Sequence, residues 1–461
     1  MEECKKHCGP GYASPEDAIR LAKHEKIIYV TCTHANDANV ADYLAVVDVD
    51  PKSKTYSQVI HRSFASHVGD EFHHTNWNTC SSCYNKANCV RNKLILPCLK
   101  SDRIYVYDTT IAKEPKLFKV IENLKSDYKL SAPHSVHCLA SGEVMISTMG
   151  DENENAQGAF VLLDGHSFDI KQLWSKQVTE FGYDFWYQPR HNIMVSSSWG
   201  APSAWRKGFS VDDVQNGKYG SKLYFWNWRE RELIKTIDLE NRGLMALETR
   251  FFHNPDRAQG FVGCALSSTV FLIGIDESKE CFAKEVISVP SLKVKNWALE
   301  EMRAVITDIL ISMDDRYLFI SNWVHGDVRQ YDVTDCNAPK LVGQLFIGGS
   351  VCDDSDVVVE TENFVKPKRP VIKGTPIRGG PQMLQLSLDG KRLYVTTSLF
   401  SVWDKQFYPS MASEGGMMLQ VDVLPNGAGL KFNENFLVDF GCEPNAPSVA
   451  HEMRYPGGDC T

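Results

Sequence analysis

The chain has 461 residues, enough for two to four ordinary domains or for one large repetitive domain. Its 58 Asp and Glu residues outnumber its 49 Lys and Arg residues, and the formal net charge of −9 excludes the basic excess of a general nucleic-acid binder. The composition, 43% hydrophobic and 23% charged, is that of a globular protein, and no apolar run of about 18 residues predicts a transmembrane segment.

Residues 1–26 form a predicted amino-terminal arm. Met1–Cys8 lead into no apolar stretch, which predicts that they are not a secretory signal. The 14 cysteines then indicate a reducing compartment, so we predict a cytosolic protein, with the nucleus or a membrane surface as alternatives. Within the arm, Pro15–Leu21 is a candidate for a short helix.

From residue 27 onward, one pattern recurs: a short strand-like segment that closes on Asp, or once on Asn. The closing residues are 49 to 90 positions apart, and a recurrence near about 55 residues is typical of a propeller blade with four strands. The segments are Tyr43–Asp48, Ile104–Asp108, Phe160–Asp164, Leu223–Asn227, Phe271–Asp276, Val328–Asp332 and Met418–Asp422. The longest interval contains residues 348–380, rich in Asp, Lys, Pro and Gly, which we predict to be an inserted loop.

A second pattern precedes these segments: a polar residue, a short apolar strand and a turn. Asp389-Gly390 is one such turn, and Asp-Gly is a strong hairpin signal. We predict that these are the innermost strands and that their leading polar residues face a central channel. The leading residues are His134, Asp184, Glu248, Asp308, Gln382 and His451, and the seventh segment is Glu71–His74.

The two ends of the chain complete each other in this scheme. Residues 27–62 contain outer strands without an inner strand before them, and His451–Tyr455 is an inner strand with no outer strand after it. We therefore predict an all-β fold, a single seven-bladed β-propeller over residues 1–461 that is closed by pairing of the N- and C-terminal strands. Two separate all-β domains are the alternative, but no linker rich in Pro, Gly or Ser divides the chain.

The first candidate site joins two adjacent histidines to a Cys-x-x-Cys motif. His73, His74, Cys80 and Cys83 lie within eleven residues, and the spacing of the cysteines lets both sulfurs reach one metal or each other. Reduced loop thiols and a structural zinc knuckle are the alternatives. No second Cys-x-x-Cys follows at zinc-ribbon spacing, which disfavours the zinc knuckle. In a reducing compartment we expect solvent-reachable redox thiols close to the histidines, without a permanent disulfide.

The second candidate site is His134-Ser135-Val136-His137. Residues i and i+3 of a regular strand point to opposite faces, so both imidazoles reach one metal only if the strand starts irregularly. Otherwise one histidine faces the channel and the other packs in the core. Strand starts converge in a propeller, so His73, His74 and His134 can meet there, with His451 as the natural substitute for a histidine that turns away.

The residue types at these positions suggest redox chemistry. Imidazole suits copper, zinc, iron and nickel, and two to four histidines with an open position suit copper or non-haem iron. The acidic residues Asp184, Glu248 and Asp308 either hold imidazoles in one tautomer or line a solvated channel. A sugar or lactone hydrolase with a calcium ion is a third interpretation, and the histidine-rich channel argues against it. No P-loop, zinc-protease or nucleophile-elbow motif is present.

Several longer segments resemble the selenium-binding protein family. The likeness runs from Cys8–Tyr12 to Tyr455–Cys460 and is most specific at Val47–Lys52, Trp77–Cys83, Tyr183–His191, Leu388–Tyr394 and Ser401–Pro409. The resemblance implies a cytosolic β-propeller that oxidises methanethiol with O2 and water to formaldehyde, hydrogen sulfide and hydrogen peroxide. It also implies dependence on copper and an association with selenium.

Carried over by motif, the resemblance makes His73, His74, His134 and His137 copper ligands. We expect the metal to bind a thiolate and expect Asp184 or Glu248 to accept the methyl proton. The chain departs from the family in one place: vertebrate members have a selenium-linked cysteine in Tyr-Cys-Gln-Val-Ile-His-Arg, and this chain has Ser57 in Tyr56–Arg62. Cys80 or Cys83 would then have to hold selenium. A selenium-binding scaffold without turnover is therefore the competing function, and protein partners are not indicated.

Overall fold

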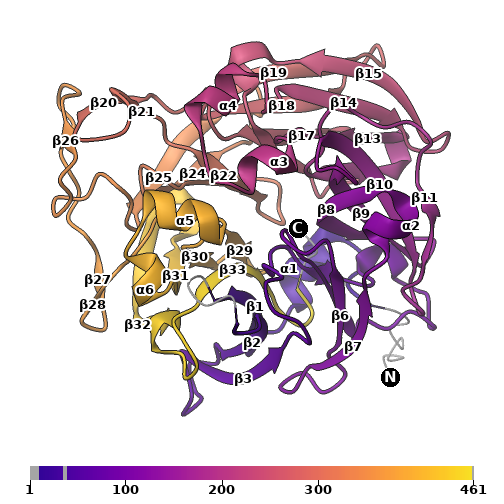
Figure 1. Cartoon of the computed structure of the whole chain (residues 1–461), viewed down its shortest axis with the longest axis horizontal. Helices are drawn as coiled ribbons and strands as arrows, with labels where there is room; N and C mark the ends of the chain where they lie inside the picture. The colour runs from indigo at the N-terminus through magenta and orange to yellow at the C-terminus, as the bar shows by residue number, and fades with distance from the viewer. Residues whose placement is uncertain (1–9, 35–38, 459–461) are drawn as a thin grey trace.

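The structure, a computed structural model, describes residues 10–34 and 39–458. Residues 1–9 of the predicted arm therefore lie outside the described residues, as do Cys8 and Cys460 at the ends of the family resemblance. The described chain is mostly β-structure, as predicted, with strands gathered in sheets around the middle of the molecule (Figure 1). Among the described helices, none is long and apolar enough to cross a membrane.

Within residues 10–34 and 39–458, the strands form seven four-stranded antiparallel sheets, an arrangement consistent with a propeller. In every sheet the first strand named below is the innermost and the last is the outermost. The first three sheets are β33 (Val449–Arg454), β1 (Ile27–Thr33), β2 (Tyr43–Asp48), β3 (Gln58–Phe64); β4 (Asn76–Trp77), β5 (Lys93–Pro97), β6 (Ile104–Asp108), β7 (Lys116–Ile121); and β8 (Leu130–Cys138), β9 (Glu143–Asp151), β10 (Ala156–Asp164), β11 (Ile170–Leu173). The other four are β12 (Phe185–Gln188), β13 (Ile193–Ser196), β14 (Lys222–Asn227), β15 (Glu232–Asp238); β16 (Ala246–Phe251), β17 (Gln259–Cys264), β18 (Thr269–Ile275), β19 (Cys281–Ser288); β22 (Ile306–Ile311), β23 (Tyr317–Asn322), β24 (Asp327–Asp332), β25 (Lys340–Phe346); and β29 (Leu384–Leu386), β30 (Arg392–Thr396), β31 (Met417–Val423), β32 (Leu430–Asp439).

The recurring Asp-closed segments are the third strands of these sheets, and the closing residue begins the turn to the fourth strand. In five sheets its side-chain oxygen accepts a hydrogen bond from the backbone N–H two residues later, which is the Asx turn that favours Asp and Asn. The pairs are Asp48 with Asp50, Asp108 with Thr110, Asp164 with His166, Asn227 with Arg229, and Asp332 with Thr334. The repeat in the sequence therefore has a local physical cause.

The first sheet joins the two ends of the described chain. Strand β33 pairs with β1 in an antiparallel manner, so the last strand of the chain is the inner strand of the sheet that begins at Ile27. The inner strands of several neighbouring sheets also contact one another: β4 contacts β8, and β12, β16, β22, β29 and β33 contact one another in that order. Residues that begin these strands are thereby brought together although they are distant in sequence.

Four inner strands carry a β-bulge at their leading polar residue, where two residues oppose a single residue of the second strand. The opposed sets are His451 and Glu452 with Thr31, His134 and Ser135 with Ser147, Leu247 and Glu248 with Gly263, and Thr307 and Asp308 with Ser321. A bulge interrupts the strict alternation of side chains and re-aims the side chain at that position. The irregular strand start that a shared metal site requires is therefore present at His134.

Side-chain hydroxyl groups of second strands, or of the residue just after one, link neighbouring sheets near the middle of the molecule. Each donates a hydrogen bond to the carbonyl of a residue that leads into the next inner strand. The bonds are Thr31 to His73 (2.8 Å), Ser147 to Tyr183 (2.5 Å), Ser197 to Leu247 (2.5 Å), Ser321 to Gln382 (2.7 Å) and Thr396 to His451 (2.5 Å). The backbones of His73 and His451 are both fixed in this way.

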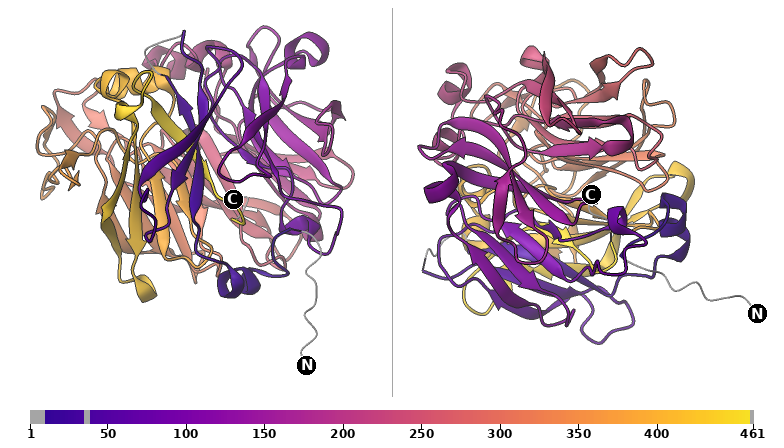
Figure 2. Two further views of the ribbon diagram at one scale, coloured as in Figure 1. Left: turned by 90° about the horizontal axis from the view of Figure 1, so that it is seen from below. Right: turned by 90° about the vertical axis from the view of Figure 1, so that its right-hand side faces the viewer.

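Helices lie outside the sheets, and Figure 2 (left) shows α1 (Pro15–Leu21) on the face opposite to α5 (Ser401–Phe407) and α6 (Met411–Glu414). Helix α1 has the predicted bounds, and the Ser14 hydroxyl caps it by accepting a bond from the N–H of Asp17. The others are α2 (Leu124–Tyr128), α3 (Pro202–Trp205) and α4 (Val211–Gln215). The sequence did not predict α5 or α3, whose Trp403 and Trp205 enter the largest apolar cluster.

The segment predicted as an inserted loop lies between β25 and β29 and contains three short strands. Strand β26 (Val358–Val359) pairs with β20 (Leu292–Lys295), which also pairs with β21 (Glu301–Met302), and β27 (Val371–Ile372) forms a hairpin with β28 (Thr375–Pro376). These strands lie at the edge of the molecule (Figure 1), away from the inner strands.

Candidate metal centre

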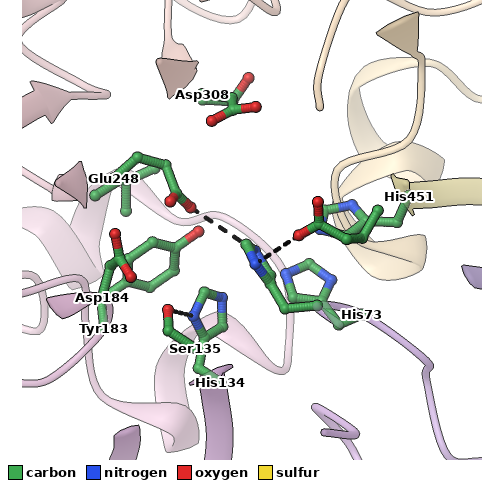
Figure 3. A network of polar contacts seen from close by, with 12 residues as sticks. His73, His134, Ser135, Tyr183, Asp184, Glu248, Asp308 and His451 are labelled. Carbon is green, nitrogen blue, oxygen red and sulfur yellow. Dashed lines mark hydrogen bonds and ion pairs between the residues drawn. The ribbon is translucent and has the colours of Figure 1, made fainter. Parts of the chain in front are cut away.

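Four of the five predicted metal ligands gather at three inner strands, just before one strand and in the bulges of two others. His73 and His74 come directly before β4, His134 lies in the bulge of β8, and His451 lies in the bulge of β33. We call His73, His74, His134 and His451 the histidine cluster. All four side chains are buried, and Figure 3 shows His73, His134 and His451 facing a common space, with Glu248 and Asp184 on its other side.

The rings of the histidine cluster are in direct contact. His73 stacks on His451 with ring centroids 3.6 Å apart, and His74 lies 4.1 Å from His134. The centroid distances from His73 are 4.8 Å to His74 and 5.3 Å to His134. His73, His74 and His451 each offer a ligand atom, and these atoms lie within 4.8 Å of one another. This spacing allows three imidazoles to bind one metal ion.

The hydrogen bonds of the rings leave one nitrogen of three histidines without a partner. His451 donates its Nδ1–H to the carbonyl of Ser398 at 2.8 Å, and Nδ1 of His134 lies 3.1 Å from the Ser135 hydroxyl. Nδ1 of His74 lies 2.9 Å from Oε2 of Glu452. The Nε2 atoms of His74, His134 and His451 are buried and make no hydrogen bond. Metal-binding histidines have this pattern, with the remote nitrogen held and the other directed at the ion, so the residues fit a bound metal.

Burial also keeps these imidazoles in the form that binds metals. It lowers the pKa of His73, His74 and His134 well below the usual value, and neighbouring histidines lower it further. Burial lowers the pKa of His451 to about 4, although the Ser398 carbonyl acts in the opposite direction. The rings are therefore neutral at physiological pH, as a metal ligand must be.

His137, the fifth predicted ligand, is placed elsewhere. Its ring packs edge-on against Phe185, Trp186 and Tyr187 of β12, with centroid distances of 4.8, 4.6 and 5.9 Å. Of the two histidines in the His-x-x-His motif, only His134 therefore contacts the other rings of the histidine cluster. This is the arrangement in which one histidine faces the centre and the other packs in the core.

The acidic residues predicted to line a channel are buried and surround Arg250. Its guanidinium lies 3.1 Å from Asp184 and 2.8 Å from Glu248, and a weaker contact of 3.5 Å reaches Asp308. Burial raises the pKa of Asp184, but Arg250 and hydrogen bonds from Thr249 outweigh it and the net shift is downward. Asp184 is therefore ionised, and its Oδ2 atom accepts three hydrogen bonds, two from Thr249 and one from Arg250. A solvated lining, one of the two interpretations of the sequence, does not describe these side chains.

Glu248 differs from Asp184 in both environment and protonation. Burial raises its pKa well above the usual value, and the charge of Asp184 adds to the effect. Its Oε1 atom makes no hydrogen bond and lies 3.7 Å from Nε2 of His74. Of the two predicted proton acceptors, Glu248 is thus the one with a free oxygen beside the histidine cluster.

Two residues of this centre were not identified as site residues from the sequence. Tyr183 packs on His134 with ring centroids 3.9 Å apart and directs its hydroxyl toward Glu248 (Figure 3). It also contacts Trp199, a member of the same apolar cluster as Trp205 of α3 and Trp403 of α5, so this side of the centre is apolar. Glu452 lies against His74, with its Oε2 beside Nδ1 of that ring. The repeated Glu-x-Arg pattern of Glu248–Arg250 and Glu452–Arg454 is the sequence signal that points to it.

The predicted redox thiols differ in exposure. Cys80 is partly exposed and begins a short 3-10 helix by accepting a bond from the N–H of Ser82. Cys83 is fully buried, with its thiol directed at the carbonyl of Leu139. Ser57 is also buried, and its hydroxyl exchanges hydrogen bonds with the backbone N–H and carbonyl of Leu437. Position 57 thus joins the turn before β3 to β32.

The comparisons with known proteins agree over nearly the whole chain. The family described as "56kDa selenium binding protein (SBP56)" matches residues 6–461. A Xenopus laevis protein named methanethiol oxidase is 55% identical over 98% of both chains, and a human protein of the same name is 54% identical over 99% of this chain and 98% of that one. The X-ray structure of a hypothetical selenium-binding protein from Sulfolobus tokodaii is 35% identical, covers 98% of this chain and 97% of its own, and superposes with a TM-score of 0.87. The chain therefore belongs to the 56 kDa selenium-binding protein family.

Proposed function

We propose that this protein is a copper-dependent methanethiol oxidase that converts methanethiol, O2 and water to formaldehyde, hydrogen sulfide and hydrogen peroxide. The names of the relatives that are 54–55% identical support the activity. The observation that carries the copper site is the set of three buried Nε2 atoms without partners in the histidine cluster. We propose His73, His74, His134 and His451 as the ligands.

The residues of the centre divide the chemistry among them. Bound copper would supply a thiolate-binding Lewis acid and a redox partner for O2. Conversion of methanethiol to formaldehyde removes a methyl proton; Glu248 offers the unpartnered Oε1, and its raised pKa makes it the stronger base of the two acids once it is ionised. Asp184, saturated by Arg250 and Thr249, holds that arginine in place and is a weaker candidate for the same role. Tyr183 and the apolar cluster exclude bulk water beside His134.

The competing function is a selenium-binding scaffold without turnover; the family description names selenium binding but no reaction. Its selenium would have to be held by Cys80 or Cys83, and only Cys80 is accessible. Elemental analysis of the purified protein, followed by a methanethiol assay for peroxide and sulfide, separates the two functions. We expect about one copper per chain and release of both products. Copper-loaded protein that releases neither product would support the scaffold.

We also infer how the whole chain is organised. The seven sheets, the pairing of β33 with β1 and the hydroxyl links between sheets support a closed seven-bladed propeller that forms a single domain. In this arrangement residues 1–26 are an arm and residues 348–380 an insertion. We propose a cytosolic location, with small-molecule substrates and no nucleic-acid partner.

A further inference from the structure

Two inner strands carry the same three-residue pattern and fold it in the same way. The guanidinium of Arg250 in β16 donates hydrogen bonds to Glu248 at 2.8 Å and to the carbonyl of Thr249 at 2.9 Å. In β33, the guanidinium of Arg454 likewise donates hydrogen bonds to Glu452 at 2.6 Å and to the carbonyl of Met453 at 2.8 Å. Each glutamate is in a β-bulge and is buried. The protein thus holds two matched carboxylates near its middle, each fixed on one oxygen by its own arginine.

His74 lies between the free oxygens of these two carboxylates, and its two nitrogens are not treated alike. Nδ1 is 2.9 Å from Oε2 of Glu452, a hydrogen-bonding distance, whereas Nε2 is 3.7 Å from Oε1 of Glu248, which is too long for a hydrogen bond. Oε2 of Glu452 makes no aligned hydrogen bond among the described residues, so its contact with His74 is a close ion-pair approach. An Nδ1 without a proton would turn its lone pair against the carboxylate oxygen at 2.9 Å, and this repulsion favours the tautomer with the proton on Nδ1.

We infer that Glu452 is a positioning residue of the metal centre, which holds His74 as the Nδ1–H tautomer and so directs the Nε2 lone pair at the ion. The inference rests on the proposed copper site. Glu452 would thus act on His74 as the Ser398 carbonyl acts on His451. Nδ1 of His451 is hydrogen-bonded to that carbonyl, and Nε2 of His451 makes no hydrogen bond. Both rings then present the same nitrogen to one ion.

The backbone supports this role, because Glu452 is tied to a neighbouring ligand. Its N–H donates to the Thr31 hydroxyl at 3.0 Å, and the same hydroxyl donates to the carbonyl of His73 at 2.8 Å. One side chain of β1 therefore sets the distance between β33 and the segment that carries His73 and His74. Arg454 supplies the charge that an otherwise unpaired buried carboxylate would lack.

The test compares Glu452→Gln with the matched variant Glu248→Gln. Both changes replace a buried carboxyl group beside an arginine in a bulge with an amide of the same shape, so both stress the fold to a similar degree. In metal-free protein labelled with nitrogen-15 histidine, we expect His74 to be the Nδ1–H tautomer in the native chain and in Glu248→Gln, and to lose this single tautomer in Glu452→Gln. Chelator competition should show copper affinity about 10- to 100-fold weaker in Glu452→Gln and a smaller loss, less than about tenfold, in Glu248→Gln, which removes a carboxyl group near the ion but no contact with Nδ1 of His74. The electron paramagnetic resonance spectrum of bound Cu(II) should change only in Glu452→Gln.

An unchanged tautomer together with native copper affinity in Glu452→Gln would overturn the inference. An equal loss of affinity in the two variants would also overturn it, since the effect would then come from the loss of any buried carboxyl group near the ion. If Glu452→Gln behaves as expected but the native copper protein does not oxidise methanethiol, the proposed activity fails and the positioning role stands. A native chain that binds no copper would refute both.

Discussion

The two histidines of β8 provide the sharpest test of the metal centre. They are three residues apart on one strand and both are buried, but only His134 contacts His74. We expect His134→Ala to weaken copper binding by about 100-fold or more, because loss of a ligand should cost at least the upper end of the 10- to 100-fold found for residues that only orient ligands. Methanethiol oxidation should fall with the copper. His137→Ala should keep the copper and instead lose packing against β12.

The variants His134→Ala and His137→Ala should also differ in their free energy of unfolding. His134→Ala loses ring contacts with Tyr183 and His74, but it also removes a buried Nε2 without a partner, a group that costs about 1–3 kcal/mol to desolvate. His137→Ala removes a ring packed against three aromatic side chains, so its cost should approach the about 2–5 kcal/mol of other large-to-small changes in cores. Urea unfolding of the metal-free proteins and chelator competition of the loaded ones measure both effects. Native copper affinity in His134→Ala, or a loss in His137→Ala as large as that in His134→Ala, would refute the assignment; exposed His166 supplies a neutral control.

Three further predictions concern residues outside the histidine cluster. Burial raises the pKa of Asp404 to about 7, so the folded protein keeps this proton while the unfolded chain loses it near 3.8; the stability of the native chain relative to Asp404→Asn should fall by up to about 1.4 kcal/mol per pH unit between pH 4 and 7 and then level off. Urea unfolding of both proteins across this range measures the difference in unfolding free energy, and a difference that does not change with pH would contradict the prediction. Alkylation of reduced, metal-free protein should label Cys80 before Cys83, and resistance of both to labelling would show that neither is a solvent-reachable thiol. Ser57→Ala should lower stability by about 1–3 kcal/mol, because it leaves the backbone groups of Leu437 unpaired, and an unchanged denaturation midpoint would be evidence against that role.

The architecture could be predicted from the sequence to the extent that its causes are local. The Asp-closed segments were found because a side-chain bond between a residue and the N–H two positions later needs no distant partner, as at Asp108 and Thr110. Helix α1 was found for the same reason, through the cap at Ser14. Helix α5 was missed because what stabilises it is distant: Glu71, 330 positions before Ser401, accepts bonds from the N–H and hydroxyl of that first helical residue.

The metal centre could be predicted only as a set of candidates. Whether His134 or His137 faces the centre depends on the register between β8 and β9, and register is not visible in one sequence. Glu452 was missed for a related reason. Neighbouring residues of a regular strand point to opposite faces, so a glutamate directly after His451 is expected to point away from it. The bulge opposite Thr31 lets both residues serve one site.

The charges around the histidine cluster support a bound metal ion independently of the Nε2 atoms that make no hydrogen bond. Four buried carboxylates, Asp184, Glu248, Asp308 and Glu452, stand against two buried guanidinium groups, Arg250 and Arg454. Buried charge without compensation is costly, and the metal-free protein reduces the cost by holding protons, since burial raises the pKa of Asp308 to about 7. A bound cation beside His74 would supply the positive charge that the arginines do not. Neutral imidazoles alone would accept several metals, and the excess of carboxyl groups over guanidinium groups supports the proposed divalent ion rather than an apolar ligand in the same space.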